Sequence, residues 1–362
     1  MKKITLILFG IIVCLSCLKR KNDSQGVITI SIDQSINKLT EGINCDNIVK
    51  NYRIIPLETS DSVLIGNGSI RHIYDDYIII TDNNTVYFFA LPDGHFIHKF
   101  NRAGNGPGEY VYINSIAFDL DHKKIYIHDL NKRSVNIYSP QGESLAQFKN
   151  DSIADIAMNK EGQFITSYYP STKWHYQVGI YDKNWEPVAS FMKNDVPPEN
   201  SNLIQIKTIK QYNGNPYISI SDTLFQISTE GVSPRLILDK GSLRLPDEVA
   251  WDMRRNNERE KYIAGDYGYW AGDFYVLFFI YNRAVYYDLW STSSSKLLYR
   301  NRITSPEEAM GIPFNLDGKI IYAWPEYVQE NSIYCILDPN QALIIDPHYN
   351  ESNNPLILEI TV

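Results

Sequence analysis

Short apolar runs separated by turn residues dominate the chain. Residues 69–100 read SIRHIYDDYIIITDNNTVYFFALPDGHFIHKF and contain four such runs, IRHIY, YIIIT, VYFFAL and FIHKF. The separators are Asp75-Asp76, Asn83-Asn84 and Pro92-Asp93-Gly94. These residue types favour tight turns, and apolar runs of this length favour strands over helices. The pattern therefore predicts four short antiparallel strands joined by hairpin turns.

The same order of four runs returns along the chain. It recurs at residues 115–148, 153–191, 204–238 and 265–299, and a less regular sixth unit begins near Met310. A four-stranded meander cannot bury both of its faces alone, so several must stack face to face. Radial stacking of such sheets is a β-propeller. Six units of roughly 50 residues predict an all-β, six-bladed propeller with four-stranded antiparallel blades, which fills residues 27–362 as a single domain.

The sixth unit lacks an outermost strand. It offers the runs KIIYAW (319–324) and PLILEITV (355–362). Residues 52–59, YRIIPLET, stand before the first unit in the position that FIHKF holds before the second. We expect this N-terminal strand to complete the last blade, because closing the ring removes open sheet edges.

Helical periodicity is clearest at residues 245–263. Asp247 is placed to cap a helix there, and Val249, Trp251 and Met253 would form its apolar side. We expect one helix at this position, between the fourth and fifth units.

The first residues read as an export signal. Lys2 and Lys3 precede the apolar segment 4–15, which is too short to span a bilayer. The segment ends in CLSC, and a small residue directly before Cys17 resembles a bacterial lipoprotein box. We expect residues 1–16 to be a lipoprotein signal peptide, Cys17 to be lipidated and residues 17–26 to be a tether. An ordinary cleaved signal peptide is the alternative. This predicts a lipoprotein of the cell envelope, in the outer membrane, with the periplasmic face and the cell surface both open.

Charge and cysteine content narrow the class further. The chain has 34 Lys and Arg against 42 Asp and Glu, a net charge of -8 that becomes -10 when Lys2 and Lys3 leave with the signal. An acidic, exported protein does not suit general binding to nucleic acid, whose phosphates demand cationic contacts. Cys45 and Cys335 stay in the mature domain, where they either form a disulfide or remain buried thiols.

The loop GNGPGEY, residues 104–110, follows a predicted outer strand. A phosphate-binding loop needs a strand before it and a helix after it, usually with Lys-Ser or Lys-Thr. Here Glu109-Tyr110 and another strand follow. We interpret the loop as a structural corner that leads from the outer strand of one blade to the inner strand of the next.

These segments also carry a family resemblance. GNGPGEY after an outer strand, YRIIPLETSDSVLIGNGSI upstream, and YYDLWSTSSSKLLY and MGIPF downstream are similar to segments of the six-bladed β-propeller lipoproteins of Bacteroidetes. The resemblance covers nearly the whole mature chain and implies the fold and the export. It marks an architecture rather than a chemistry, so no catalytic residue is carried over from it.

Propeller ligands usually bind at the end of the central channel where the inner strands begin. The polar residues predicted near these starts are Arg71, Asn114, Asp155, Lys207, Asp266 and Glu308. They would form a ring that binds a small ligand or an ion, or they would line a water-filled channel.

Aromatic residues offer a second kind of site. The candidates are Tyr267, Tyr269 and Trp270 in YGYWAGDFY, and Trp174 in the third unit. Exposed rings could stack on sugars or hold a partner protein, whereas buried rings would belong to the core.

No catalytic signature accompanies this architecture. The seven histidines are scattered singly, and none lies in a His-Glu-x-x-His motif. We therefore expect a non-enzymatic, membrane-anchored binding or scaffold propeller, accessory to the uptake of a glycan or peptide nutrient. It would be monomeric, without a cofactor, and with a protein or glycan partner in the cell envelope.

Two alternatives stay open. One is a glycan-binding module. The other is a metal-dependent hydrolase or lactonase that binds calcium in the channel. The candidate metal ligands for that enzyme are Asn114, Asp155, Asp266 and Glu308.

Overall fold

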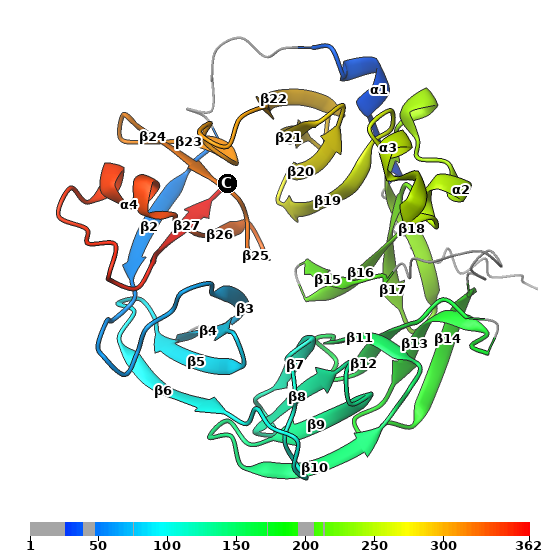
Figure 1. The fold of residues 1–362 in the computed structure, drawn as a ribbon, viewed down its shortest axis with the longest axis vertical. Coiled ribbons are helices and arrows are strands. Elements are labelled where there is room, and N and C mark those ends of the chain that lie inside the picture. The colour runs from blue at the N-terminus through cyan, green and yellow to red at the C-terminus, as the bar shows by residue number, and fades with distance from the viewer. Residues whose placement is uncertain (1–25, 39–47, 75, 172, 195–205, 213) are drawn as a thin grey trace, which may run out of the picture.

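Six β-sheets surround a central axis in the computed structural model (Figure 1). The structure describes residues 26–38, 48–74, 76–171, 173–194, 206–212 and 214–362. Every sheet around the axis contains four antiparallel strands, as the repeated units predict. The six-bladed, all-β propeller is therefore confirmed.

We number the blades in chain order, from the unit that begins at Ser69. Blades 1 and 2 comprise β3 (Ser69–Ile73), β4 (Tyr77–Asp82), β5 (Thr85–Ala90), β6 (Phe96–Asn101), and β7 (Ser115–Asp119), β8 (Lys124–Asp129), β9 (Ser134–Tyr138), β10 (Ser144–Lys149). Blades 3 and 4 comprise β11 (Ile153–Met158), β12 (Phe164–Tyr168), β13 (Tyr176–Tyr181), β14 (Pro187–Lys193), and β15 (Ile209–Tyr212), β16 (Asn215–Ile220), β17 (Thr223–Ser228), β18 (Gly231–Asp239), with β1 (Ile28–Ser31) added to blade 4. Blades 5 and 6 comprise β19 (Ala264–Ala271), β20 (Phe274–Tyr281), β21 (Ala284–Ser291), β22 (Lys296–Ile303), and β25 (Tyr327–Gln329), β26 (Ser332–Ile336), β27 (Leu356–Thr361), β2 (Asn51–Pro56).

The middle strands of each blade explain the apolar runs in the sequence. In β4 and in β5, five of six residues are buried, because neighbouring blades cover both faces of the sheet. The turn between them places Asn83 at a φ of +52°, a left-handed conformation that asparagine tolerates. In the outermost strand β10, five of six residues are exposed. Hydrophobicity therefore falls from the middle of a blade to its outer edge.

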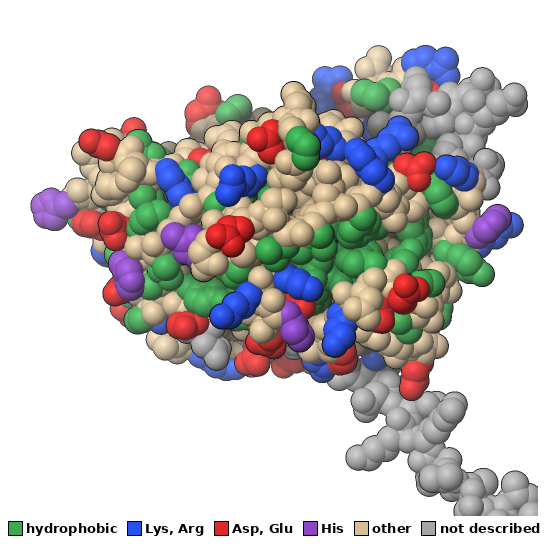
Figure 2. Space-filling view, turned by 90° about the horizontal axis from the view of Figure 1, so that it is seen from below, with side chains coloured by type: hydrophobic (Ala, Val, Ile, Leu, Met, Phe, Trp, Pro, Cys, Tyr) green, Lys and Arg blue, Asp and Glu red, His purple; other side chains and the backbone are tan. Residues whose placement is uncertain are grey.

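The outer strands form the rim of the molecule. On β6, β10 and β14 they expose the apolar side chains of Ile97, Leu145 and Val188. Figure 2 shows hydrophobic side chains on the molecular surface among charged side chains of both signs. Such charges disfavour edge-to-edge pairing of exposed strands.

Strand β2 closes the ring. It pairs antiparallel with β27, from Asn51 opposite Thr361 to Pro56 opposite Leu356. Ile55 of β2 is fully buried in the core between blades 6 and 1. The prediction that residues 52–59 complete the last blade is confirmed, with strand bounds of 51–56.

A fifth strand extends blade 4, which the repeats do not predict. β1 runs parallel to β18, with Ile28 opposite Leu236. Ile30 of β1 and Ile32 in the adjoining helix α1 (Ile32–Ser35) are fully buried against blades 4 and 5. The run is four residues long and its partner is distant in sequence, so no local pattern announces the pairing.

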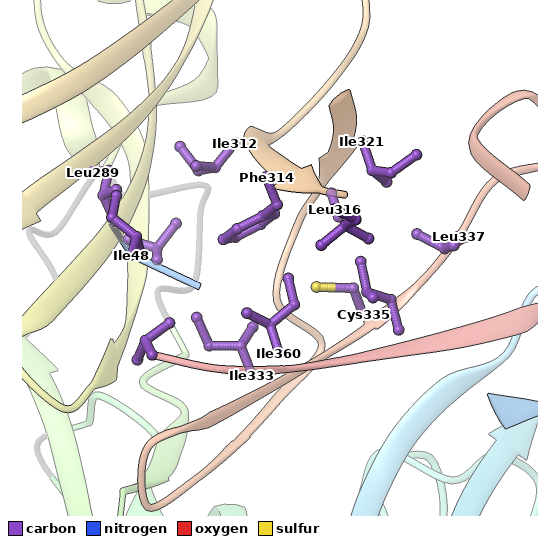
Figure 3. Close-up of a cluster of buried hydrophobic side chains, with 14 of the residues drawn as sticks. Ile48, Leu289, Ile312, Phe314, Leu316, Ile321, Ile333, Cys335, Leu337 and Ile360 are labelled. Atoms are coloured by element: carbon purple, nitrogen blue, oxygen red, sulfur yellow. The ribbon is translucent and has the colours of Figure 1, made fainter. Parts of the chain in front are cut away.

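The sixth unit departs from its predicted register. Residues 312–323 form a separate hairpin of β23 (Ile312–Leu316) and β24 (Lys319–Ala323), and the innermost strand of blade 6 is β25. The hairpin packs in the buried cluster that includes Cys335 (Figure 3). The expected start of the sixth inner strand near Met310 is therefore wrong. Apolar alternation indicates that a strand is buried, but it does not say against which sheet.

Residues 245–263 form short helical turns instead of the predicted single helix. The turns are α2 (Asp247–Ala250), η2 (Met253–Arg255) and α3 (Asn256–Arg259), after η1 (Gly241–Leu243). Val249 and Trp251 are buried, but Met253 is 61% exposed, so the apolar face is too short to hold a continuous helix. The longest helix in the described ranges is α4 (Pro339–Ile345), and none there has the length and apolar character to cross a membrane.

The glycine-rich loop at 104–110 is a corner between blades 1 and 2. The Gly106 N–H donates to the Glu109 carboxylate at 2.7 Å. Tyr110 is fully buried, and its hydroxyl donates to the Asn84 carbonyl at 2.7 Å. The loop therefore uses a carboxylate of its own where a phosphate loop would hold its ligand, as the corner interpretation expects.

A buried ion pair ties the N-terminal segment to blade 5. Arg300 on β22 and Asp288 on β21 have side-chain exposures of 1% and 0%, and an Arg300 Nη2–Asp288 Oδ2 distance of 2.5 Å. Arg300 Nη1 also donates to the backbone oxygen of Ser35 in α1 at 2.5 Å. The Trp290 indole N–H donates to Asp288 at 3.1 Å. Several hydrogen bonds thus accompany the buried charges.

The Arg300→Met variant should lower the free energy of unfolding by about 3–5 kcal/mol, because it leaves the Asp288 carboxylate buried without its cation. Urea denaturation measures the change. The matched control is Arg283→Met, which removes an ion pair to Glu260 with side-chain exposures of 79% and 42%. That variant should change stability by no more than about 1 kcal/mol. Equal, small effects in both variants would contradict the structural role of the buried pair.

Candidate ligand site in the channel mouth

A cavity of about 320 Å³ lies on the axis, at the end of the channel where the inner strands begin. Three of the predicted residues line it, namely Arg71, Asn114 and Asp155. The further polar and aromatic lining includes His72, Ser115, Thr208, Lys210, Gln211, Tyr212, Tyr269, Glu326 and Tyr327. The cavity therefore draws side chains from all six blades.

Asp155 joins two blades. It is 7% exposed, its Oδ1 accepts the N–H of Ile156 at 2.8 Å, and its Oδ2 accepts the N–H of Ile209 in blade 4 at 2.7 Å. Burial raises the pKa of Asp155 to about 6, and the backbone donors and the Arg71 charge oppose this rise. Both carboxylate oxygens are already engaged, so this residue mainly fixes blade 3 to blade 4.

Lys210 brings a cation to the wall from blade 4, beside Asp155 of blade 3. Its Nζ donates to the Gly268 carbonyl at 2.8 Å and lies 4.4 Å from the ring centroid of Tyr269 and 5.0 Å from that of Tyr267. Burial lowers the pKa of Lys210 to about 7, against the opposing charge of Asp266. An ammonium group has three donors, so one carbonyl leaves capacity for a ligand.

Arg71 and Glu326 face the cavity from adjacent blades. Arg71 Nε donates to Thr81 Oγ1 at 2.7 Å. Burial lowers the pKa of Arg71 and raises that of Glu326, and the charge of each residue opposes the shift of the other. Within the described part of the chain, the Glu326 carboxylate has no hydrogen bond or ion pair. Both groups therefore retain binding capacity toward the cavity.

The four charged side chains alternate in sign around the axis. In blade order they are Arg71 in blade 1, Asp155 in blade 3, Lys210 in blade 4 and Glu326 in blade 6. Blades 1 and 4 lie across the axis from each other, and so do blades 3 and 6 (Figure 1). Like charges thus stand far apart, and each cation has a carboxylate on a neighbouring blade.

His72 and Tyr327 lie at the inner end of the cavity. His72 Nδ1 and the Tyr327 hydroxyl are 3.2 Å apart. Burial lowers the pKa of His72 to about 4, so its imidazole is neutral at physiological pH. Both residues also line a cavity at the other end of the axis, and they therefore form part of the waist of the channel.

Three predicted channel residues lie elsewhere. Asp266 accepts from the buried Lys240 Nζ at 2.7 Å. Glu308 accepts the backbone N–H groups of Thr304 at 2.9 Å and Ser305 at 2.8 Å, ahead of the β23–β24 hairpin. Lys207 is not part of the cavity lining, and its carbonyl accepts the Ser167 hydroxyl at 2.6 Å. Glu308 is expected in the channel from the sequence because the sixth inner strand is predicted to begin near Met310. That inner strand is β25 instead, so Glu326 lines the channel mouth and Glu308 does not.

The candidate metal ligands consequently do not converge. Asn114 and Asp155 line the cavity, whereas Asp266 and Glu308 do not. Among the residues that the structure describes, no group of three or more His, Cys, Asp or Glu side chains could hold a metal ion.

The aromatic candidates separate into three places. Tyr267 and Tyr269 join Trp324 in a ring cluster on the axial side of blade 5, with centroids 5.5 and 5.8 Å from that of Trp324. Tyr267 is 41% exposed, and Tyr269 lines the cavity. Trp174 is half-buried beneath the Lys173 ammonium, 4.5 Å from its ring centroid.

Trp270 lies in a second cavity, of about 390 Å³, at the opposite face of the propeller. Tyr212 and Asn215, at the facing ends of β15 and β16, line this cavity with the turns that join β19 to β20 and β21 to β22, together with Gly26 and Ile28 at the start of β1. Trp270 and Tyr217 contribute rings with centroids 6.5 Å apart, and Arg235 adds a cation.

The predicted cysteine roles fall largely outside the described residues. Cys17 and Cys45 both lie there, so lipidation and the Cys45–Cys335 pairing stay predictions. Cys335 is fully buried, near the centre of Figure 3, and forms no disulfide with a described residue. Burial raises its pKa, which disfavours the reactive thiolate.

Comparisons with known proteins agree with the fold. A family model described as "Domain of unknown function (DUF4934)" matches residues 27–360. The chain is similar to a Bacteroides fragilis NCTC 9343 protein that is named as exported, with 16% identity over 93% of this chain and 99% of that chain and a TM-score of 0.69. It is also similar to a member of the DUF4221 family from Bacteroides vulgatus ATCC 8482, with 10% identity over 86% and 96% of the two chains and a TM-score of 0.51. At these identities the likeness concerns the fold alone. The chain matches no curated protein.

Lys210 should make stability depend on pH. Its folded-state pKa of about 7 lies below the ordinary 10.5, so unfolding takes up a proton between these values and the folded state gains stability as pH rises through that window. Relative to Lys210→Met, the wild type should therefore gain free energy of unfolding from pH 7 toward pH 10, with little change below pH 6. Urea denaturation across this range measures the difference. Lys183→Met, at an exposed turn, is the control and should give a flat difference. A flat profile for Lys210→Met would contradict the lowered pKa of Lys210.

Proposed function

The chain belongs to the DUF4934 family, and we propose that it is an exported, lipid-anchored binding propeller whose small ligand occupies the channel-mouth cavity. The observation that carries this proposal is a cavity lined by Arg71, Lys210 and Glu326, whose charged groups can each form further hydrogen bonds with a ligand. Burying a charge without replacing its contacts to water costs stability. A ligand that completes these contacts would recover that cost, which is the arrangement expected of a binding site.

Anchoring is supported by the sequence. The CLSC segment, with Cys17 as the lipid acceptor, and the resemblance to Bacteroidetes propeller lipoproteins both favour it. In this role the protein would capture its ligand in the cell envelope and pass it to a protein partner as an accessory to nutrient uptake.

The orientation on the membrane follows from the anchor. Gly26 and Ile28 line the second cavity, at the face opposite the channel mouth. Gly26 lies nine positions after Cys17, and a segment of that length spans at most about 30 Å when fully extended. A lipid on Cys17 would hold the second-cavity face toward the membrane, so the channel mouth would open away from it.

Binding is favoured over hydrolysis by the roles of the cavity groups. Both carboxylate oxygens of Asp155 accept hydrogen bonds from backbone N–H groups, and His72 is a neutral imidazole in contact with a tyrosine hydroxyl. Two of the four candidate metal ligands lie outside the cavity. The groups with spare capacity, Arg71, Lys210 and Glu326, are charged contacts of the kind that orient a bound ligand.

A ligand of the channel mouth should raise the melting temperature of the wild type and lose this effect in Glu326→Gln. The isosteric change removes only the charge, so binding should weaken by about tenfold or more. The measurement is a thermal-shift screen of a metabolite collection, followed by calorimetry of each hit. Glu330→Gln, at the exposed β25–β26 turn, is the matched control and should bind as the wild type does. Hits that bind both variants equally would count against the channel-mouth site.

A glycan-binding function is the second candidate. Trp270 and Tyr217 border the second cavity, and aromatic rings beside a charged group suit a sugar face and its hydroxyls. A saccharide hit whose effect disappears in Trp270→Ala but persists in Glu326→Gln would assign that cavity instead of the channel mouth.

Lipidation should depend on Cys17. Cys17→Ser should shift the protein from the membrane fraction to the soluble fraction and abolish incorporation of labelled palmitate, because the acceptor thiol is lost. Cell fractionation with immunoblotting reads the result. Cys14→Ser is the matched control and should remain in the membrane fraction. Membrane retention of Cys17→Ser would contradict the lipid anchor.

A further inference from the structure

The channel-mouth groups also indicate the class of ligand, an inference that rests on the proposed function. Arg71 directly precedes His72 on β3, and Glu326 directly precedes Tyr327 at the start of β25. The contact of 3.2 Å between His72 and Tyr327 joins these two strands. A cation and a carboxylate therefore start from neighbouring positions on blades 1 and 6.

Both of these charged side chains line the cavity. Each alters the pKa of the other, which requires proximity, yet no ion pair of 4 Å or less joins Arg71 and Glu326 in the described chain. Among the described residues, the Arg71 side chain has one hydrogen bond, from Nε to Thr81, so its terminal nitrogens are available there. A ligand can therefore place an anionic group on Arg71 and a cationic group on Glu326 at the same time.

Charge balance favours a ligand that carries both signs. The cavity wall holds two cations and two carboxylates, which alternate around the axis. A ligand with one charge would leave a buried excess of that sign, and the desolvation of an unbalanced charge is costly. A zwitterion adds no net charge and can satisfy both Arg71 and Glu326.

We propose that the ligand is a small zwitterion of the α-amino-acid type, with its carboxylate on Arg71 and its ammonium group on Glu326. The two charged groups of an α-amino acid are attached to one carbon, which suits partners on adjacent blades. The cavity of about 320 Å³ is near the lower end of the range of about 300–1,000 Å³ for small-molecule sites. This size suits an amino acid better than an oligosaccharide, and the ligand side chain would extend toward Lys210 and Tyr269 on the far wall.

The test is calorimetric titration of the full-length protein in detergent with each of the twenty L-amino acids. At least one should bind. Its N-acetyl derivative, which lacks the ammonium charge, and its carboxamide, which lacks the carboxylate, should each bind about tenfold more weakly or worse.

Paired protein variants assign the two contacts. In Glu326→Gln the penalty for N-acetylation should shrink toward onefold, while the penalty for the carboxamide persists. In Arg71→Gln the penalty for the carboxamide should shrink toward onefold while the penalty for N-acetylation persists. The reason is that a contact already removed by the protein substitution cannot be lost a second time by changing the ligand. Glu330→Gln, the exposed control, should keep both penalties. A merely structural effect of either substitution would reduce all affinities together without changing these ratios.

Two results would overturn the assignment. One is that none of the twenty amino acids binds, and the other is that the blocked derivatives bind as tightly as the parent. If an uncharged or singly charged hit from the metabolite screen still depends on Glu326, the zwitterion is wrong but the channel-mouth function stands. If no hit depends on Glu326, both proposals fail.

Discussion

Antiparallel pairing of β2 with β27 is the contact on which the remaining architecture depends. β2 precedes blades 1 to 5 in the sequence, yet it is the outermost strand of blade 6. Segments near the two ends of the domain therefore share one sheet. Without it, blade 6 would present an open edge and blade 1 would lose a buried neighbour that includes Ile55. Closure also fixes the distance between Arg71 in blade 1 and Glu326 in blade 6, because these flank the junction.

Charged side chains inside the propeller occur both as a fully buried ion pair and as half-buried groups that line the cavity. Asp288 and Arg300 satisfy each other and the helix α1, with hydrogen bonds from Trp290 and to Ser35, so they contribute a specific connection within the core. Arg71 and Glu326 do not satisfy each other, although each senses the other's charge. The ion pair is thus complete in blade 5 and incomplete on the axis, and this difference is what the proposed ligand site rests on.

The two faces of the propeller differ in a way that follows from chain topology. Inner strands begin at one face, where the charged cavity lies, and they end toward the other, where the start of β1 lines the second cavity. The described chain therefore begins, at Gly26, beside the cavity on the face opposite the channel mouth. A lipid anchor at that face would leave the channel mouth free. Any force on the anchor would act through β1 on the edge of blade 4 rather than on the axis.

The sequence by itself determined the local elements and their repetition. Buried middle strands must be apolar on both faces, and hairpins need turn residues such as Asn83, so the apolar runs and the turns between them reveal the number of blades. An N-terminal strand outside the repeats and a sixth unit without its outermost strand then predict that the ring closes. The sequence also predicts that Arg71, Asn114 and Asp155 lie at the channel mouth, because they stand near the starts of inner strands in units that follow the repeat regularly. Tertiary structure alone decided what depends on distant partners, namely the parallel pairing of β1, the separate β23–β24 hairpin, and the positions of Lys210 and Glu326 on the axis. The physical reason is that alternation records whether a side chain is buried, whereas the tilt and stacking of six sheets decide which of the buried or half-buried groups meet.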